Sequence, residues 1–376
     1  MNLELTEDQG FFRATTRKFL ESEVPISAVR ALYESPDSFD REWWIRGAEL
    51  GWTSMFVPES LGGGSLSGHP TSDLAIVAEG MSRMVSPGPL LAVNVVASAL
   101  ADAARDGSLT GPLEAAMRGL LSGRSIATWA LCEGGRWDAT AIRTTVSSDA
   151  GDLVLNGVKT FVEAAAVAAH FLVTAASEGG LVHVLVPAGA AGVEVRSGRS
   201  VDLTRRFGTV RLGNVSVPVA HQVGSAGAAG AATSRLIAVT LCLLCAEMCG
   251  VADRAFEMTL EYGRDRFAFG RPIVSFQALK HRIADMEVRL EGSEAVTDAL
   301  AQQIDSGAGD LGILASVARA YVGDTSLDAV DDCVQITGGI SVTWEHDIHL
   351  YSRRAQVDRA VCGTRRTTRR SSCRIC

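Results

Sequence analysis

The segment from Arg264 to Met286 (RDRFAFGRPIVSFQALKHRIADM) holds residue types that suit a phosphate-bearing ligand. Arg266 supplies a planar guanidinium fork that matches phosphate oxygens. Gly270 and Pro272 interrupt the preceding helical pattern at a fixed place. Gln277 offers both a donor and an acceptor where the next helical pattern begins. A joint between two helices is the simpler interpretation of Arg266 alone, but the whole run favours a cradle for a phosphate-bearing cofactor.

A second stretch with ligand-binding character runs from Gln335 to Asp347 (QITGGISVTWEHD). Gly338 and Gly339 permit a close approach of the backbone to a ligand, and Gln335 supplies a side-chain amide. A glycine helix breaker without a ligand is the alternative interpretation of this stretch.

These two stretches resemble motifs of the acyl-CoA dehydrogenase family, R-x-x-F-G-x-P-I-x-x-F-Q and Q-x-x-G-G. The run from Pro58 to Gly63 (PESLGG) is similar to that family's P-E-x-x-G-G loop. In the family, the arginine-containing motif and the Q-x-x-G-G motif contact the FAD of a neighbouring subunit. The resemblance therefore implies that FAD is held across a subunit boundary, and the residues that match are Arg266, Phe269, Gln277, Gln335, Gly338 and Gly339.

Oxidation of a thioester between Cα and Cβ requires a carboxylate that takes the α-proton. In many family members this glutamate stands immediately before a Gly-Thr pair, and here that position is Cys362. A neutral thiol is a poor base, so we expect the base elsewhere.

Glu247 is the replacement that we expect, because it stands alone in the apolar run from Leu236 to Ala252. Burial would raise its pKa toward the range of a general base, and some family members place their base on this same helix. A structural glutamate paired with an arginine such as Arg254, or one that faces solvent, is the alternative. Glu345 is a lesser candidate for the base.

The central part of the chain matches the family's flavin motifs less closely. The run from Leu131 to Asp138 (LCEGGRWD) keeps an acid and glycines but lacks the usual small hydroxyl residues, and Glu163 stands where a hydroxyl residue is common. By resemblance, we expect four residues here to line the flavin: Cys132, Glu133, Phe161 and Val162.

The elements that must position these residues fall into three regions. Helical periodicity extends from Thr6, a capping residue, to about residue 122. Alternating β-branched runs follow, at 125–131, 152–155, 170–175, 181–186 and 208–217, and long helical patterns return after residue 234. We predict an α+β chain with an N-terminal helical domain (1–122), a central small β-barrel or sandwich (123–220) and a C-terminal helical bundle (221–362). A basic, disordered tail (363–376) completes the chain.

Composition excludes several classes of function. The net charge of -8 argues against nucleic acid as a partner, and we expect no membrane span, because the most apolar stretch contains Glu247. Cys242, Cys245 and Cys249 share one helical face and are read as small apolar residues rather than metal ligands. We see no secretory signal, and thiols without a disulfide framework indicate a reducing cytoplasm.

The resemblance implies a flavoprotein acyl-CoA dehydrogenase that passes electrons to an electron-transfer flavoprotein. Because family sites are shared between chains, we expect a homo- or hetero-oligomer. The alternative is a non-catalytic partner subunit that contributes FAD contacts to a heteromeric dehydrogenase. A flavin oxidase or oxygenase on the same fold lacks positive support in the sequence. Branched, long-chain and ring-bearing acyl groups all stay open.

Overall fold

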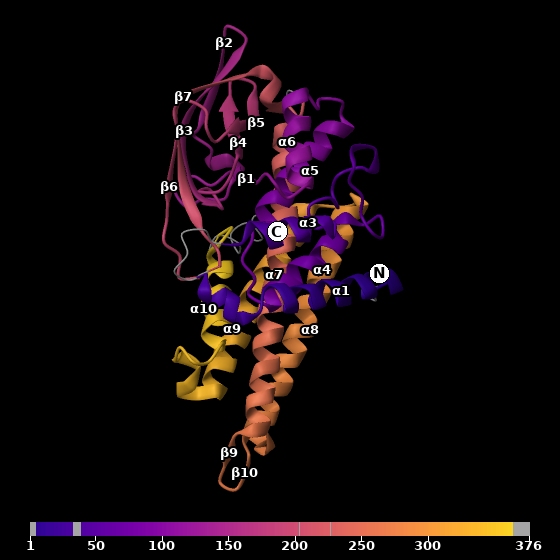
Figure 1. The fold of residues 1–376 in the computed structure, drawn as a ribbon, viewed down its shortest axis with the longest axis vertical. Coiled ribbons are helices and arrows are strands. Elements are labelled where there is room, and N and C mark those ends of the chain that lie inside the picture. Colours follow the sequence, from indigo (N-terminus) through magenta and orange to yellow (C-terminus); the bar gives the residue numbers. More distant parts are fainter. Residues whose placement is uncertain (1–4, 33–38, 203, 226, 364–376) are drawn as a thin grey trace.

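The computed structural model describes residues 5–32, 39–202, 204–225 and 227–363. An N-terminal group of helices, a β-sheet region and a long C-terminal helical bundle follow one another along the chain (Figure 1). The predicted tail from Thr364 to Cys376 lies outside the described residues.

The N-terminal helices are α1 (Glu7–Glu23), α2 (Ile26–Ala31), α3 (Arg41–Glu49), η1 (Glu59–Leu61), α4 (Pro70–Arg83), α5 (Leu90–Arg105) and α6 (Gly111–Leu121). Two of these helices, α1 and α3, begin at a residue whose side chain caps the helix, Thr6 and Asp40. Thr6 accepts a hydrogen bond from the Gln9 amide at 3.2 Å, and the Gln9 side chain accepts one from the Thr6 amide at 3.1 Å. This reciprocal pair is a capping box, so the predicted start of the first helix is confirmed.

The central region forms one connected sheet of eight strands with the path β6-β7-β3-β2-β4-β5-β8, and β1 pairs with β4. The strands are β1 (Ala127–Ala130), β2 (Thr145–Asp149), β3 (Asp152–Glu163), β4 (His170–Ser177), β5 (Gly180–Pro187), β6 (Val193–Ser197), β7 (Phe207–Pro218) and β8 (Gln222–Val223), with short turns η2 (Ala139–Ala141) and η3 (Val219–His221). The five predicted strand regions are confirmed. Strands β2 and β6 escaped prediction because almost all of their residues are exposed or half-buried, which removes the apolar alternation.

The C-terminal bundle is built around α7 (Ala229–Asp265), which packs against α4, α8 and α9. Helix α7 is long and apolar enough to cross a membrane, but 89% of its apolar window is buried inside this chain, as expected of a core helix. Cys242, Cys245 and Cys249 are all buried in it, as predicted.

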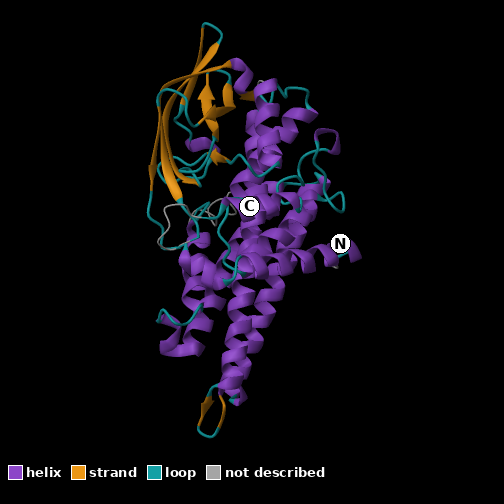
Figure 2. Cartoon of the chain, viewed as in Figure 1, coloured by secondary structure: helices purple, strands orange, loops and turns teal. Residues whose placement is uncertain are grey.

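A two-stranded hairpin, β9 (Phe267–Ala268) and β10 (Arg271–Pro272), joins α7 to α8 (Gln277–Ser306) through η4 (Ile273–Ser275). The chain then returns along α9 (Leu311–Thr337), η5 (Gly338–Val342) and α10 (Ile348–Ala360). Figures 1 and 2 show the hairpin at the end of the molecule opposite the sheet. The predicted site residues on the hairpin and those on the sheet therefore lie at opposite ends of the molecule.

Candidate active site

Glu247 lies in the buried middle of α7, with 5% of its surface exposed. One carboxylate oxygen, Oε2, accepts a hydrogen bond from Arg205 Nη1 at 2.7 Å. The other, Oε1, lies 3.2 Å from Arg354 Nη2. The carboxylate is therefore held by guanidinium groups from two other parts of the chain, the loop before β7 and helix α10.

The same two arginines bind further carboxylates. Arg205 donates from Nε and Nη2 to the two oxygens of Glu163 at 2.9 and 2.8 Å, and from Nη1 to Asp358 Oδ1 at 2.7 Å. Arg354 Nε bonds both oxygens of Asp358 at 3.0 and 2.9 Å. We call this group, with Glu247, the arginine–carboxylate cluster; it joins the sheet region to α7 and α10.

Burial raises the pKa of Glu247 to about 7, while the positive charges of Arg205 and Arg354 oppose the shift. The nearby carboxylates of Asp358 and Glu163 add to the rise. A carboxyl group with this pKa exchanges its proton near neutral pH, which is what a general base needs.

The alternative for Glu247, a glutamate paired with an arginine, is met by Arg205 and Arg354 and not by Arg254, the arginine that the sequence suggested. Arg254 instead binds Glu257 at 3.1 Å and Glu261 at 3.2 Å on its own helix. The solvent-facing alternative is wrong, because Glu247 is buried.

Cys362 is half-buried and lies near the cluster, close enough for the charges of Arg319, Arg205 and Glu163 to act on its thiol. Burial raises the pKa of this thiol to about 12, so it stays neutral and cannot act as a base at physiological pH. Arg319, 1% exposed, fixes the adjoining backbone because its Nη2 donates to the carbonyl of Val361 at 2.9 Å.

On the sheet side, the predicted flavin-lining residues divide into exposed and buried groups. The Phe161 ring is 55% exposed and its backbone has φ of 51°, whereas Val162 and Cys132 are buried, each 1% exposed. Phe161 therefore offers an open aromatic face, whereas the side chains of Val162 and Cys132 belong to the interior of the sheet region.

Glu133 lies at the start of the loop between β1 and β2, and its carboxylate is fully engaged. It accepts hydrogen bonds from Lys159 Nζ at 2.6 Å and from the amides of Arg143 and Thr144 at 2.7 and 3.0 Å. Its observed contacts hold the loop in place, with Lys159 entirely buried.

The predicted cofactor-binding residues of the 264–286 stretch lie far from Glu247 and the arginine–carboxylate cluster. Arg266 ends α7, Gln277 begins α8, and Phe269, at the tip of the hairpin, is 97% exposed with φ of 51°. The nineteen residues of helix from Glu247 to Arg266 span about 28 Å at 1.5 Å per residue.

Gln335, Gly338 and Gly339 lie at the hairpin end of the bundle too, where α9 ends and η5 begins. The ion pair between Arg282 of α8 and Asp332 of α9, 2.6 Å long, ties the ends of these helices together. The chain thus gathers its two motifs at the hairpin end of the bundle, whereas Glu247 lies midway along α7 and the sheet-side residues lie at the other end (Figure 1). Glu345 lies on an exposed loop, away from the cluster.

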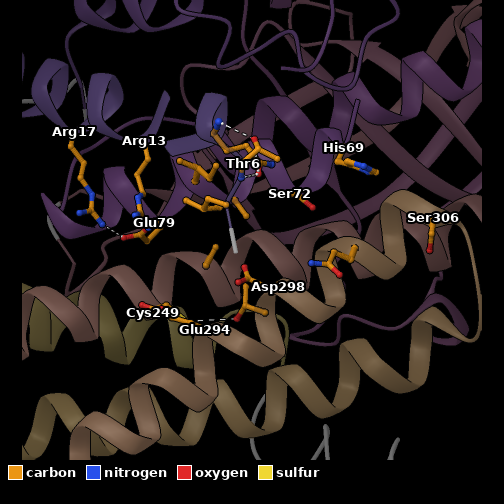
Figure 3. Close-up of a pocket in the computed structure, with 17 residues that line it drawn as sticks. Thr6, Arg13, Arg17, His69, Ser72, Glu79, Cys249, Glu294, Asp298 and Ser306 are labelled. Atoms are coloured by element: carbon orange, nitrogen blue, oxygen red, sulfur yellow. Dashed lines mark hydrogen bonds and ion pairs between the residues drawn. The ribbon is translucent and has the colours of Figure 1, made fainter. Parts of the chain in front are cut away.

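A cavity of about 570 Å³ lies elsewhere, between α1, α4, α7 and α8. Figure 3 shows Arg13 and Arg17 of α1 near Glu79, with Glu294 and Asp298 on α8 facing them. None of the predicted site residues lines this cavity, so it is separate from the candidate active site. No group of three or more potential metal ligands occurs within the part of the chain that the structure describes.

Sequence reasoning missed Arg205, Arg354 and Asp358. Arg354 and Asp358 are spaced i, i+4 on a helix, a readable pairing signal. Arg205 gave no such signal, since its partners lie 42 and 153 positions away.

Three family models match this chain: the N-terminal domain of acyl-CoA dehydrogenase at residues 6–108, its middle domain at 132–212 and its C-terminal domain at 230–374. The acyl-CoA dehydrogenase IpdE2 of Mycolicibacterium smegmatis is 30% identical over 352 residues, which cover 93% of each chain. An acyl-CoA dehydrogenase of Bacillus subtilis is 27% identical over 96% of each.

Solved structures give the same result. The ChsE4-ChsE5 complex from Mycobacterium tuberculosis matches with a TM-score of 0.86 at 27% identity, over 100% of this chain and 98% of that one. A variant of the Tcur3481-Tcur3483 steroid ACAD matches with a TM-score of 0.88 at 26% identity, over 98% of this chain and 97% of that one. With all three domains matched in order, this chain belongs to the acyl-CoA dehydrogenase family of flavoprotein oxidoreductases.

Proposed function

We propose that this acyl-CoA dehydrogenase uses Glu247 as the base that takes the α-proton of a CoA thioester. The observation that carries the proposal is the buried Glu247 carboxyl group at the junction of sheet and bundle, with its pKa raised to about 7 by burial. A carboxylate has about four lone-pair sites. The two arginine contacts therefore leave Glu247 able to accept a proton from a substrate.

FAD fits the residues at both ends of the proposed site. Bound FAD would accept the hydride that leaves Cβ, while the α-proton passes to Glu247, so the product is the 2-enoyl thioester. The open face of Phe161 suits a flavin ring, and Val162 and Cys132 lie in the interior of the same sheet region. At the other end, exposed Arg266 and Gln277 suit phosphate and polar parts of the cofactor.

We propose that these two ends come from different chains. They are too far apart in one chain to hold a single FAD, whereas a partner subunit can bring its own hairpin end to the sheet. Large apolar side chains are exposed at that end, and such a patch is typical of an interaction surface: Phe267, Phe269, Ile340, Val342 and Trp344. Gln335, Gly338 and Gly339 would join Arg266, Phe269 and Gln277 in this cross-subunit contact.

Among the sheet-side residues, we assign Glu133 a supporting role in the flavin site. Its carboxylate is occupied by Lys159 and two backbone amides, so it shapes the loop that carries Gly134 and Gly135. These two glycines have φ of 55° and 77°, a conformation that glycine adopts readily.

The remaining partners follow from the family. We propose an acyl-CoA substrate and an electron-transfer flavoprotein as the acceptor of the two electrons from reduced FAD. The described cysteines are free thiols, in keeping with our prediction of a cytoplasmic location.

The second candidate function is a non-catalytic subunit of a heteromeric dehydrogenase. The observation that favours it is Cys362, a neutral thiol at the family's glutamate position. The ChsE4-ChsE5 structure, described as a complex, is a precedent for assembly of two different chains. We favour the catalytic role because Glu247 places a buried carboxyl group at the junction of sheet and bundle, and the experiments below separate this role from a purely structural ion pair with Arg205 and Arg354.

The first experiment compares Glu247→Gln with the parent chain. The purified protein is expected to show flavin absorption near about 450 nm and to reduce an artificial acceptor with straight-chain, branched or ring-bearing acyl-CoA. Glu247→Gln should retain the flavin and lose turnover by about 10³-fold or more. Glu261→Gln, an exposed change on the same helix, is the matched control. Retained turnover in Glu247→Gln would refute the assignment of the base, and a flavin-free parent chain would favour the partner-subunit function.

The second experiment tests the shared site by complementation. Phe161→Asp damages the sheet end and Arg266→Glu damages the hairpin end, so each variant alone should lose FAD. Random mixing in a dimer with two shared sites yields about one quarter of sites intact on both sides. Co-refolded variants should therefore recover about that fraction of flavin. No recovery on mixing, with both variants folded and oligomeric, would contradict a site shared between copies of this chain.

A further inference from the structure

Arg205 contacts both Glu247 and Glu163, which stands at the end of the strand that carries Phe161. Its Nε and Nη2 face Glu163, and its Nη1 is divided between Glu247 and Asp358. The side chain is 2% exposed, so it cannot reorient into solvent. The direction of the Nη1 bond to Glu247 is therefore fixed by the bidentate grip of Glu163 on the other edge of the guanidinium group.

Glu163 ends strand β3, immediately after Phe161 and Val162. It replaces the hydroxyl residue that the sequence motif commonly has there, just as Cys362 replaces a glutamate. Glu163 binds Arg205 directly, and Cys362 lies close enough for the charges of Arg205 and Glu163 to act on its thiol. The two residues that differ from the family motifs, Glu163 and Cys362, are thus both near Arg205, which also binds Glu247.

We propose that Glu163 and Arg205 form a positioning pair, which orients the Glu247 carboxylate toward the substrate and balances its charge from the sheet side. The inference rests on the proposed function of Glu247 as the base. Neither member of the pair is proposed as the base. Arg205 binds Glu163 through two parallel N–H donors, which is a tighter pairing than the single arginine contact at each oxygen of Glu247. The guanidinium group of Arg205 keeps its proton at all physiological pH values.

The groups that face Glu247 determine the sign of the effect. From the sheet side they are Arg205 and Glu163, and from α10 they are Arg354 and Asp358. Burial raises the pKa of Glu247, the arginines lower it, and the two carboxylates raise it further. Cys362 stays neutral and does not enter this balance.

Removal of the Glu163 charge should therefore lower the pKa of Glu247. The repulsion between the Glu163 and Glu247 carboxylates would be gone, and the positive charge of Arg205 would be balanced by fewer anions. Both changes stabilise the ionised form of Glu247. The expected size is about one pH unit, the lower end of the range for a charge in this proximity.

The test is the pH dependence of kcat/KM for Glu163→Gln with FAD bound. Activity of the parent should fall as pH drops through about 7, where Glu247 becomes protonated, and Glu163→Gln should move this fall to lower pH. Glu163→Asp keeps the charge and should stay closer to the parent. Glu178→Gln removes an exposed carboxylate from the same sheet region and should leave the profile unmoved.

Arg205→Lys tests orientation separately from charge. Lysine keeps the positive charge but lacks the fork, so we expect kcat to fall about tenfold or more with a smaller change in KM. An unshifted profile in Glu163→Gln together with unchanged kcat in Arg205→Lys would overturn the positioning pair.

A spectroscopic measurement separates failure of this pair from failure of the base assignment. The carboxylic-acid C=O stretch of Glu247 is identified by infrared difference spectroscopy as the band absent in Glu247→Gln, and its titration is followed without turnover. If Glu247→Gln remains active, the base assignment fails. If the titration midpoint of that band does not move in Glu163→Gln, the positioning pair fails.

Discussion

Loss of the Lys159 ammonium group should destabilise the sheet region more than most single substitutions. Lys159 has no exposed surface, and its Nζ lies 2.6 Å from Glu133 Oε1 and 2.6 Å from the carbonyl of Thr174. At an effective dielectric constant of about 20, two unit charges at this distance attract by about 6 kcal/mol before desolvation is counted. The desolvation cost offsets much of that attraction, but an unpaired partner left behind is expensive.

We therefore expect Lys159→Met to cost about 3 kcal/mol of unfolding free energy, at the lower end of the range for a broken buried pair. The lower end applies because Glu133 keeps two backbone donors, the amides of Arg143 and Thr144. At about 2.1 cal/mol/K of unfolding entropy per residue, a cost of about 3 kcal/mol over 376 residues lowers the thermal midpoint by about 4 °C. The fluorescence of Trp129, buried on the adjacent strand β1, reports on this part of the sheet.

The double variant Lys159→Met/Glu133→Gln isolates the pair. Because it removes the orphaned charge, it should be less damaged than the sum of the single variants, with a coupling energy of about 2 kcal/mol. Additive losses, or a Lys159→Met protein that unfolds with the parent, would refute the view that this ion pair holds the loop at Glu133.

Three further outcomes are expected. Thr6→Ala removes the capping box of α1 and should cost about 1 kcal/mol, seen as faster hydrogen exchange at the Gln9 amide. Burial raises the pKa of Asp298 from 3.8 to about 6, so stability is lost as pH rises through that range. Asp298→Asn should therefore stabilise the protein by about 1–3 kcal/mol at pH 8, and unfolding curves near pH 3 should show no such gain. Arg30 donates to the Trp344 carbonyl at 2.6 Å, and Arg30→Ala should speed proteolysis of the loop around Trp344.

The fold was largely readable from local patterns. The capping residue Thr6, the helical spacing of α4 and α5, and the β-branched alternation of β3, β4, β5 and β7 all specify their elements within short windows. Strands β2 and β6 were not readable because they contribute little to the core, and their pairing is set by neighbouring strands. The three-domain order followed from the resemblance, and the family matches confirm it.

The site was readable only in part, because a buried acid and its cations need not be near in sequence. The apolar surroundings of Glu247 correctly predicted burial and therefore a need for a positive partner. Arg254 was the nearest arginine in the sequence, but seven helical positions place it about 10 Å along the axis. The cations that do reach Glu247 come from other elements, at 2.7 Å from Arg205 and 3.2 Å from Arg354.

The proposed base, Glu247, depends on charged groups outside its own helix. A carboxylate on α7 must be neutralised by groups on the facing elements, since its own helix offers none in contact. Arg205 supplies that charge, and its Nη1 is shared between Glu247 and Asp358, each at 2.7 Å. Glu163, at the end of β3, binds the other edge of the same guanidinium group at 2.8 Å and is its third carboxylate partner. The acid on α7, the thiol after α10 and the acid on β3 are therefore best understood as one coupled set of residues, and the effect of changing any one of them should depend on the other two.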